Sequence, residues 1–173
     1  MENLKFYEID PDYMDYLRHF EPKVPNNVKN GNSKPYCGIV LSINGFNYYA
    51  PVSSFNQSQF TNFPIKDIDD NNNEFIISTV RFCYMVPAPN EVLTLKNFST
   101  NDYKYNGLLS KELSYCQKPD NRNKIRTKAQ KIRNLKPTHA WYSQCCDFNL
   151  LENLCASYTK KLCASTSKEL QYT

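Results

Sequence analysis

The stretch CGIVLSINGFNYYAPV, residues 37–52, decides the fold class. Two apolar runs, 37–43 and 46–52, stand on either side of Asn44-Gly45. Asn-Gly between two such runs is the strongest short-range signal for a β-hairpin, because both central residues of a type I′ turn need positive φ. The sequence therefore predicts two antiparallel strands joined by a two-residue turn.

Outward from this hairpin, residues 4–9 and 75–86 also have the composition or alternation of strands, and 91–95 is a shorter candidate. Asp10-Pro11 has the pattern of a helix N-cap followed by proline in the first turn, which predicts a helix over 11–20. Residues 26–33 and 53–73 are rich in Asn, Ser, Gln and Asp, and we expect loops there.

After about residue 102 the apolar period becomes helical. One helix is expected from Tyr105 to Cys116, a second around Ile125–Ile132, and a third capped by Asp147. Strands first and helices afterwards predict an α+β domain, with a twisted antiparallel sheet or partial barrel covered by helices. We expect one domain over residues 1–163 and a frayed tail over 164–173.

Composition excludes several classes of protein. A chain of 173 residues suits one domain. Seven cysteines at irregular spacing, without a secretory signal, argue against a disulfide framework, and two distant histidines argue against a zinc site. No apolar run is long enough to span a membrane, so we expect a cytoplasmic protein. We also expect no cofactor.

Positive charge is concentrated in one segment. Residues 118–136 hold eight of the 21 basic residues, opposed only by Asp120. A solvated helix face is the simpler interpretation, but like charges at i, i+4 oppose helix formation unless bound phosphates relieve them. No DNA-binding motif is present, so we favour RNA over DNA. The predicted RNA contacts are Lys118, Arg122, Lys124, Arg126, Lys128, Lys131 and Arg133.

No familiar hydrolase motif or two-metal carboxylate cluster occurs. A ribonuclease that works without metal needs neither of these, because the 2′-hydroxyl of RNA is the nucleophile. The protein has only to position it, supply positive charge and transfer protons. Antiparallel pairing across Asn44-Gly45 should bring Lys34 to the same end of the sheet as Ser53 and Ser54. On spacing alone, a solvent lysine and two loop serines that close a strand are the favoured explanation of these residues.

These residues also carry a family resemblance. The segment 34–41, continuing through 48–54, resembles the signature of the ToxN/AbiQ endoribonucleases of type III toxin–antitoxin systems. Residues 5–7, 13–17, 23–25, 85–87 and 109–134 are similar too, so the resemblance covers roughly residues 4–162. Within the family the chain is most similar to the CptN branch.

The resemblance implies a twisted sheet related to the Kid/MazF barrel, and RNA cleavage to 2′,3′-cyclic phosphate and 5′-hydroxyl ends without metal. It implies an antitoxin RNA of tandem repeats, processed into pseudoknots that inhibit the toxin in a closed toxin–RNA complex, and a role in abortive infection. By position, Lys34 and Ser54 match the active-site lysine and serine, Ser53 a neighbouring hydroxyl, and Tyr13 a groove tyrosine that binds RNA.

One position departs from the family pattern. Better-studied members have a lysine two residues after the serine, where this chain has Asn56. A neutral amide contacts RNA but lacks the charge of an ammonium. Either Lys66 or Arg81 replaces that charge, or Lys34 has the larger role. The rival hypothesis is a non-catalytic module that binds structured RNA.

Overall fold

The computed structural model describes residues 3–26, 28–29, 32–98 and 102–169. Its main sheet is antiparallel and open, with strand order β6-β7-β5-β4-β1-β9 and β8 paired with β5. The strands are β1 (Lys5–Ile9), β4 (Tyr36–Ile43), β5 (Phe46–Ser53), β6 (Asn62–Ile68), β7 (Glu74–Arg81), β8 (Val86–Pro87) and β9 (Leu93–Leu95). The predicted α+β class is confirmed, and the sheet does not close into a barrel.

The β4–β5 hairpin is confirmed. Asn44 and Gly45 have φ of 53° and 81°, as a type I′ turn requires. The register shifts between Cys37 and Leu41, where Gly38 lies against the ring of Tyr49. A Cβ at Gly38 would lie 2.1 Å from Tyr49 Cδ1, so glycine is needed for this close approach.

Four helices are described: α1 (Pro11–Phe20), α2 (Tyr103–Gln117), α3 (Pro119–Arg133) and α4 (Phe148–Glu169). The predicted caps are confirmed for α1, where Asp10 Oδ1 accepts from Asp12 N, and for α4, where Asp147 Oδ1 accepts from Leu150 N. Three 3₁₀ turns, η1 (Phe82–Tyr84), η2 (Asn90–Val92) and η3 (Tyr142–Gln144), lie in the connections.

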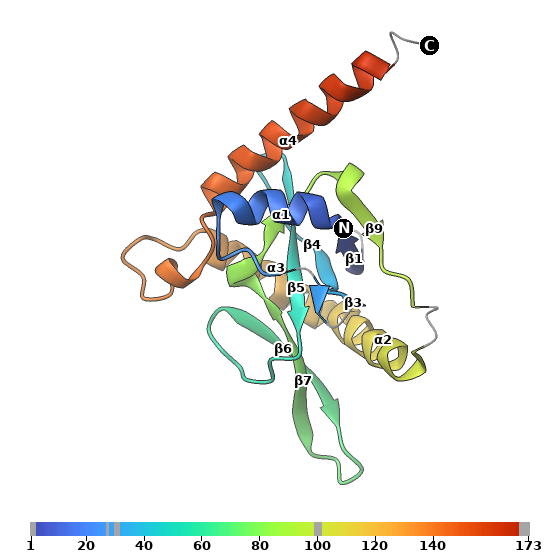
Figure 1. Ribbon diagram of the computed structural model, residues 1–173. Coiled ribbons are helices and arrows are strands. Elements are labelled where there is room, and N and C mark those ends of the chain that lie inside the picture. Colours follow the sequence, from blue (N-terminus) through green and yellow to red (C-terminus); the bar gives the residue numbers. More distant parts are fainter. Residues whose placement is uncertain (1–2, 27, 30–31, 99–101, 170–173) are drawn as a thin grey trace.

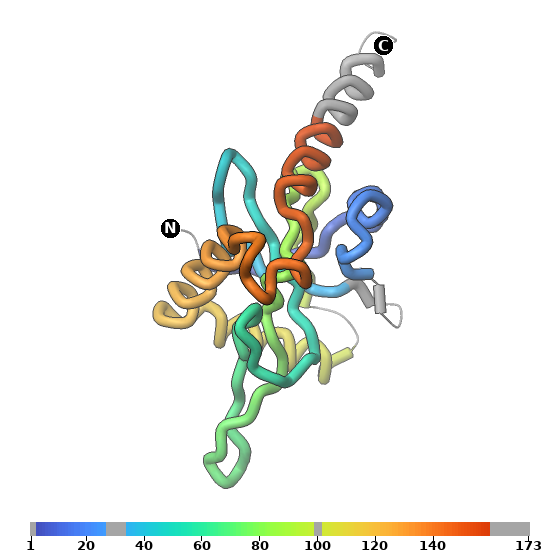
Figure 2. The backbone as a smooth tube through the Cα atoms, turned by 90° about the vertical axis from the view of Figure 1, so that its left-hand side faces the viewer, coloured from blue at the N-terminus to red at the C-terminus, as the bar shows by residue number. Residues whose placement is uncertain are grey.

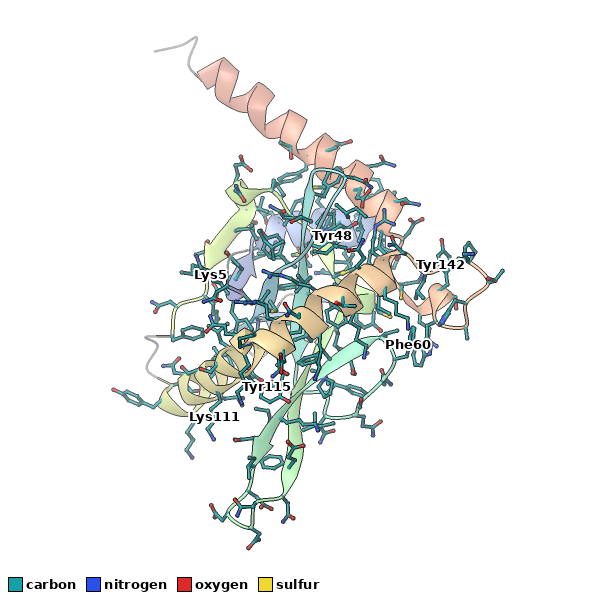
Figure 3. All side chains as sticks on the ribbon, turned by 180° about the vertical axis from the view of Figure 1, so that it is seen from behind. Lys5, Tyr48, Phe60, Lys111, Tyr115 and Tyr142 are labelled. Atoms are coloured by element: carbon teal, nitrogen blue, oxygen red, sulfur yellow. The ribbon has the colours of Figure 1, made fainter. Side chains whose placement is uncertain are left out.

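The helices cover the sheet from two sides. Figure 1 shows α1 in front of the strands, and Figure 3, drawn from behind, shows α3 crossing them on the opposite side. The apolar stripe of α3 is fully inward, with Ile125, Ala129 and Ile132 at most 1% exposed. Figures 1 and 2 also show the β6–β7 hairpin standing away from the rest of the molecule.

Several predicted boundaries were wrong. Residues 53–73 are not one loop, because Asn62–Ile68 forms β6, whose pattern is hidden by Pro64 and by polar neighbours. The strand predicted over 75–86 ends at Arg81, where η1 turns the chain so that β8 can pair with β5. Within the predicted loop 26–33, Val28–Lys29 (β2) pairs with Asn32–Ser33 (β3). Helix α4 continues past residue 163 to Glu169, and 170–173 lie outside the described residues.

Candidate active site at the end of β5

The pairing of β4 with β5 brings the predicted catalytic residues to one edge. Tyr36 pairs with Pro51, and the backbone N–H of Val52 donates to the carbonyl of Pro35 over 2.9 Å. Continuing this register by one residue sets Lys34 opposite Ser53. On the other side of β5, Ser53 pairs with Thr79 of β7. Ser53 thus lies between β7 and the segment that leads into β4, at the point where β5 ends.

The loop after Ser53 is held by buried polar side chains. Thr79, which is 0% exposed, donates its hydroxyl to the Phe55 carbonyl over 3.0 Å. Asn62, 1% exposed, donates to the Gln57 carbonyl over 2.9 Å and accepts from the Gln59 N–H over 3.0 Å. These bonds order a loop whose Ser54 and Asn56 side chains are exposed. An exposed hydroxyl on a fixed backbone is suited to meet a substrate phosphate.

Arg81 is one cation that the fold brings to this loop, from β7. Its guanidinium carbon lies 4.9 Å from the ring centroid of Phe55 and 4.7 Å from that of Tyr84. Opposite residues in an antiparallel pair share a face and successive residues alternate, so Arg81 points to the same face as Thr79 and Ser53. No hydrogen bond or ion pair engages its guanidinium within the described part of the chain.

Lys66 is placed differently. Its ammonium lies 2.8 Å from Glu74 Oε2, on the outward β6–β7 hairpin. Hydrogen bonding to Glu74, followed by its charge, raises the pKa of Lys66. Of the two cations considered as substitutes at the Asn56 position, Arg81 therefore has the better placement and the unused donors.

Helix α3 faces the same loop with its C-terminal half. Lys128 Nζ donates to the Gln59 carbonyl over 3.4 Å, and Lys131 Nζ lies 5.0 Å from the ring centroid of Phe60. Burial, and then the charge of Lys131, lowers the pKa of Lys128. A bound phosphate would relieve this repulsion. Lys124, one turn earlier, is exposed.

The family model described as toxin ToxN of the type III toxin–antitoxin system matches residues 5–156. The chain belongs to the ToxN family. It is 30% identical to the endoribonuclease ToxN of Pectobacterium atrosepticum over 168 residues, which cover 91% of this chain and 95% of that protein. It is 29% identical to the endoribonuclease ToxN of Bacillus thuringiensis subsp. kurstaki over 171 residues, which cover 92% and 87%.

Solved structures agree with this assignment to the ToxN family. A bacterial type III toxin–antitoxin structure, in which a non-coding RNA pseudoknot selectively inhibits the toxin, superposes with a TM-score of 0.77 at 28% identity, covering 91% of this chain and 99% of that chain. AbiQ, a lactococcal anti-phage endoribonuclease, gives 0.77 at 26% identity, covering 92% and 99%.

Arg133, one of the predicted RNA contacts, is engaged inside the protein in this member of the ToxN family. Its Nε and Nη2 donate to Glu152 Oε1 over 3.0 and 2.9 Å, and Tyr48 donates to the same oxygen over 2.6 Å. The side chains of Arg133 and Glu152 are only 13% and 11% exposed. The pattern of positive charge could not show this, because Glu152 lies in another helix.

Tyr13 also differs from its expected place. Its side chain is 0% exposed, its hydroxyl donates to the Pro87 carbonyl over 2.7 Å, and its ring packs edge-on to Tyr158. Burial, as the main cause, raises the pKa of Tyr13. A ring without exposed surface cannot stack on a base. In this ToxN-family chain Tyr13 therefore joins α1 to β8 and α4.

The other predicted contacts are spread along α3. Lys118 Nζ lies 5.2 Å from the ring centroid of Tyr115, and Arg122 hydrogen-bonds Asn3. Arg126 lines a cavity of about 590 Å³ between β4 and α3. These three side chains lie toward the start of the helix, away from the contacts that Lys128 and Lys131 make with the loop.

The described residues contain no group of three His, Cys, Asp or Glu side chains that could hold a metal ion. The six cysteines for which the structure gives side chains are unpaired and buried, including Cys145 and Cys146. No helix in the described ranges is long and apolar enough to cross a membrane. Nothing in the sequence alone pointed to Thr79 or Asn62 as supports of the serine loop.

Proposed function

We propose that this chain is an endoribonuclease toxin of the cytoplasm that cuts cellular mRNA and its own repeated antitoxin RNA without a metal ion. The products are 2′,3′-cyclic phosphate and 5′-hydroxyl ends, and the processed pseudoknot RNA inhibits the enzyme in a closed toxin–RNA complex. The observation that carries this proposal is the exposed side chain of Ser54 between Ser53, which the register sets opposite Lys34, and Phe55, which packs on Arg81. The relatives of this chain are endoribonucleases.

The reaction needs no external nucleophile. The 2′-oxygen of the substrate attacks its neighbouring phosphorus, the P–O5′ bond breaks, the 2′-hydroxyl loses a proton and the 5′-oxygen gains one. Ser53 Oγ accepts the Phe55 N–H over 3.3 Å, so the Ser53 hydroxyl hydrogen remains available for a phosphate oxygen. Ser54, one residue further, holds a second oxygen. Asn56 contacts the RNA as a neutral donor.

Two cations stabilise the negative charge of the developing phosphorane, one from each side. Lys34 neutralises the phosphate from the β4 side and takes part in proton transfer. Arg81 approaches from the β7 side, where its planar donors suit two phosphate oxygens at once. Removing one such preorganised donor typically costs about 10²–10³ in kcat.

Exposed and partly exposed basic side chains at the start of α3 and along it provide the antitoxin surface. Lys118, Lys124 and Arg126 bind RNA backbone along the helix, which explains a charge excess that no carboxylate of the same helix compensates except Asp120. Arg122 contributes there while bound to Asn3.

The test is expression of the chain in a bacterium without antitoxin, with growth recorded and 5′-hydroxyl RNA ends mapped. Wild type should arrest growth and generate new ends, whereas Ser54→Ala and Lys34→Ala should do neither. Ser110→Ala, an exposed serine on α2, is the matched control and should behave as wild type. Cleavage by all four proteins would move the active site elsewhere. Tight RNA binding without cleavage by any of them would favour the non-catalytic module.

Arg81 and Lys66 form a second matched pair. Arg81→Met keeps an aliphatic chain over the rings of Phe55 and Tyr84 but removes the charge, and should lower kcat by about 10²-fold. Lys66→Met, which removes a charge already paired with Glu74, should leave kcat within about twofold. The opposite order would assign the missing charge to Lys66.

A further inference from the structure

A partly exposed aromatic and basic cluster lies at the far end of the serine loop. The ring of Phe60 stacks on His139, with centroids 4.9 Å apart and planes at 23°, and Lys131 Nζ lies 5.0 Å from the Phe60 centroid. Figure 3 shows Phe60 beside the end of α3, close to the segment that carries Tyr142. We call Phe60, His139 and Lys131 the stacking platform.

The segment that presents His139 is held by its own hydrogen bonds. Trp141 N donates to His139 Nδ1 over 3.2 Å, and Tyr142 N donates to the His139 carbonyl over 2.9 Å. Because Nδ1 accepts, the neutral ring carries its hydrogen on Nε2, which is a donor. Further along, Cys146 N donates to the Cys83 carbonyl over 2.9 Å, which fastens the segment to η1. The imidazole is therefore preorganised rather than loosely attached.

Phe60 belongs to the same loop as the catalytic serines, and His139 and Lys131 pack against it from outside the loop. Ser54 begins the loop and Phe60 is six residues later, a span of at most about 20 Å if extended. The actual separation is shorter, because Asn62 folds Gln57 and Gln59 back toward β6. Lys128 reaches the carbonyl of Gln59 from α3. A strand of RNA leaving the serines would meet two ammonium groups and an aromatic stack.

We propose that the stacking platform binds an unpaired nucleobase of the substrate RNA, on the exposed part of the His139–Phe60 stack, while Lys128 and Lys131 neutralise its phosphate. Unpaired bases stack on aromatic side chains, and basic groups beside them follow the backbone. Packing alone would explain the two rings, but two lysines turned toward the same loop oppose each other until an anion joins them. The inference rests on the proposed function, since it takes the substrate to be RNA cut at Ser54.

The chain provides its own reporter for this site. Trp141 is the only tryptophan and lies two residues from His139. The experiment uses the full chain with Ser54→Ala, to prevent cleavage, titrated with a short single-stranded RNA of mixed sequence at fixed salt. Trp141 fluorescence and the anisotropy of the labelled RNA are measured together. Addition of Phe60→Leu or of His139→Ala should each weaken binding roughly tenfold.

Phe75→Leu is the matched control, because Phe75 is 46% exposed on the outward hairpin, and its affinity should equal that of the parent. RNA of the same length with abasic residues should leave Trp141 fluorescence unchanged while still binding in a salt-dependent way. Affinities within twofold of the parent for both platform variants would overturn the inference, as would equal quenching by abasic RNA. His139→Ala decides the matter if Phe60→Leu fails to fold.

Failure of the underlying function is recognised separately. If Ser54→Ala still cuts RNA, the catalytic assignment is wrong, and products appear on a gel whatever the platform variants do. The affinities of the platform variants, measured on an uncleavable 2′-deoxy strand, then still decide whether a base binds at Phe60 and His139.

Discussion

The ion pair between Arg133 and Glu152 allows a sharp prediction about stability. Glu152→Gln keeps the size of the side chain and an oxygen acceptor but removes its charge. Three hydrogen bonds end on Glu152 Oε1: one from Tyr48 and two from Arg133. The Tyr48 bond becomes neutral and the two Arg133 bonds lose the charge of their acceptor, a loss of about 1 kcal/mol each. The sum, about 3 kcal/mol, agrees with the usual cost of about 3–5 kcal/mol for breaking a buried pair.

Urea unfolding followed by far-UV circular dichroism measures this loss, in the Ser54→Ala background so that the protein can be expressed. With a slope of about 2 kcal/mol/M, the midpoint should fall by about 1.5 M. The double variant Arg133→Met, Glu152→Leu removes both charges and should recover most of the loss. A fall below about 0.5 kcal/mol for Glu152→Gln, together with weaker RNA binding for Arg133→Met at unchanged stability, would refute the structural role and return Arg133 to the RNA surface.

Three further predictions concern packing, pH and salt. Gly38→Ala should lower stability by about 1–3 kcal/mol in urea unfolding, since the ring of Tyr49 must move; an unchanged midpoint would contradict the close approach. Glu112 is 4% exposed and burial raises its pKa, so the protein loses stability as the pH rises through that pKa. Glu112→Gln should therefore raise Tm at neutral pH but not below about pH 4, and equal gains at the two pH values would exclude this cause. The triple variant Lys124→Gln, Lys128→Gln, Lys131→Gln removes three positive charges from α3. It should reduce the slope of log K against log salt by about 2, measured by fluorescence anisotropy with single-stranded RNA, whereas an unchanged slope would indicate a merely solvated face.

Local signals explain which parts of the fold could be predicted. Asn44-Gly45 fixed the hairpin, and Asp10-Pro11 and Asp147 fixed the starts of α1 and α4, because each signal acts within a few residues. The sheet beyond the hairpin was harder. Strand β6 contains Pro64 and polar residues, and its pairing partner β7 decides its conformation.

In the candidate site, too, local signals could be predicted and long-range partners could not. Pairing across the hairpin correctly brought Lys34 to the edge where Ser53 lies, because register follows from the turn. The choice between Lys66 and Arg81 depended on Glu74, which only the folded hairpin brings to Lys66. Long-range partners of this kind have no local signature.

The family pattern could mislead for the same reason. Tyr13 occupies the position of a groove tyrosine, yet its ring is covered by Tyr158 of α4, which lies at the other end of the chain. In the sequence Arg133 is one more charge of a basic helix, but in the folded protein it forms an ion pair with Glu152. Burial of single side chains is decided by elements that sequence windows do not join.

The outward β6–β7 hairpin has a practical consequence for protein engineering. Its tip is closed by Asp69, whose carboxylate accepts the N–H groups of Asn71 and Asn73, and every side chain from Ile68 to Phe75 is exposed. Exposed turns with few contacts to the body accept inserted sequence with little loss of stability. An affinity tag or fluorophore-binding peptide placed between Asp70 and Asn71 would leave both the serine loop and α3 uncovered, and would allow the toxin to be followed while it is bound to its RNA.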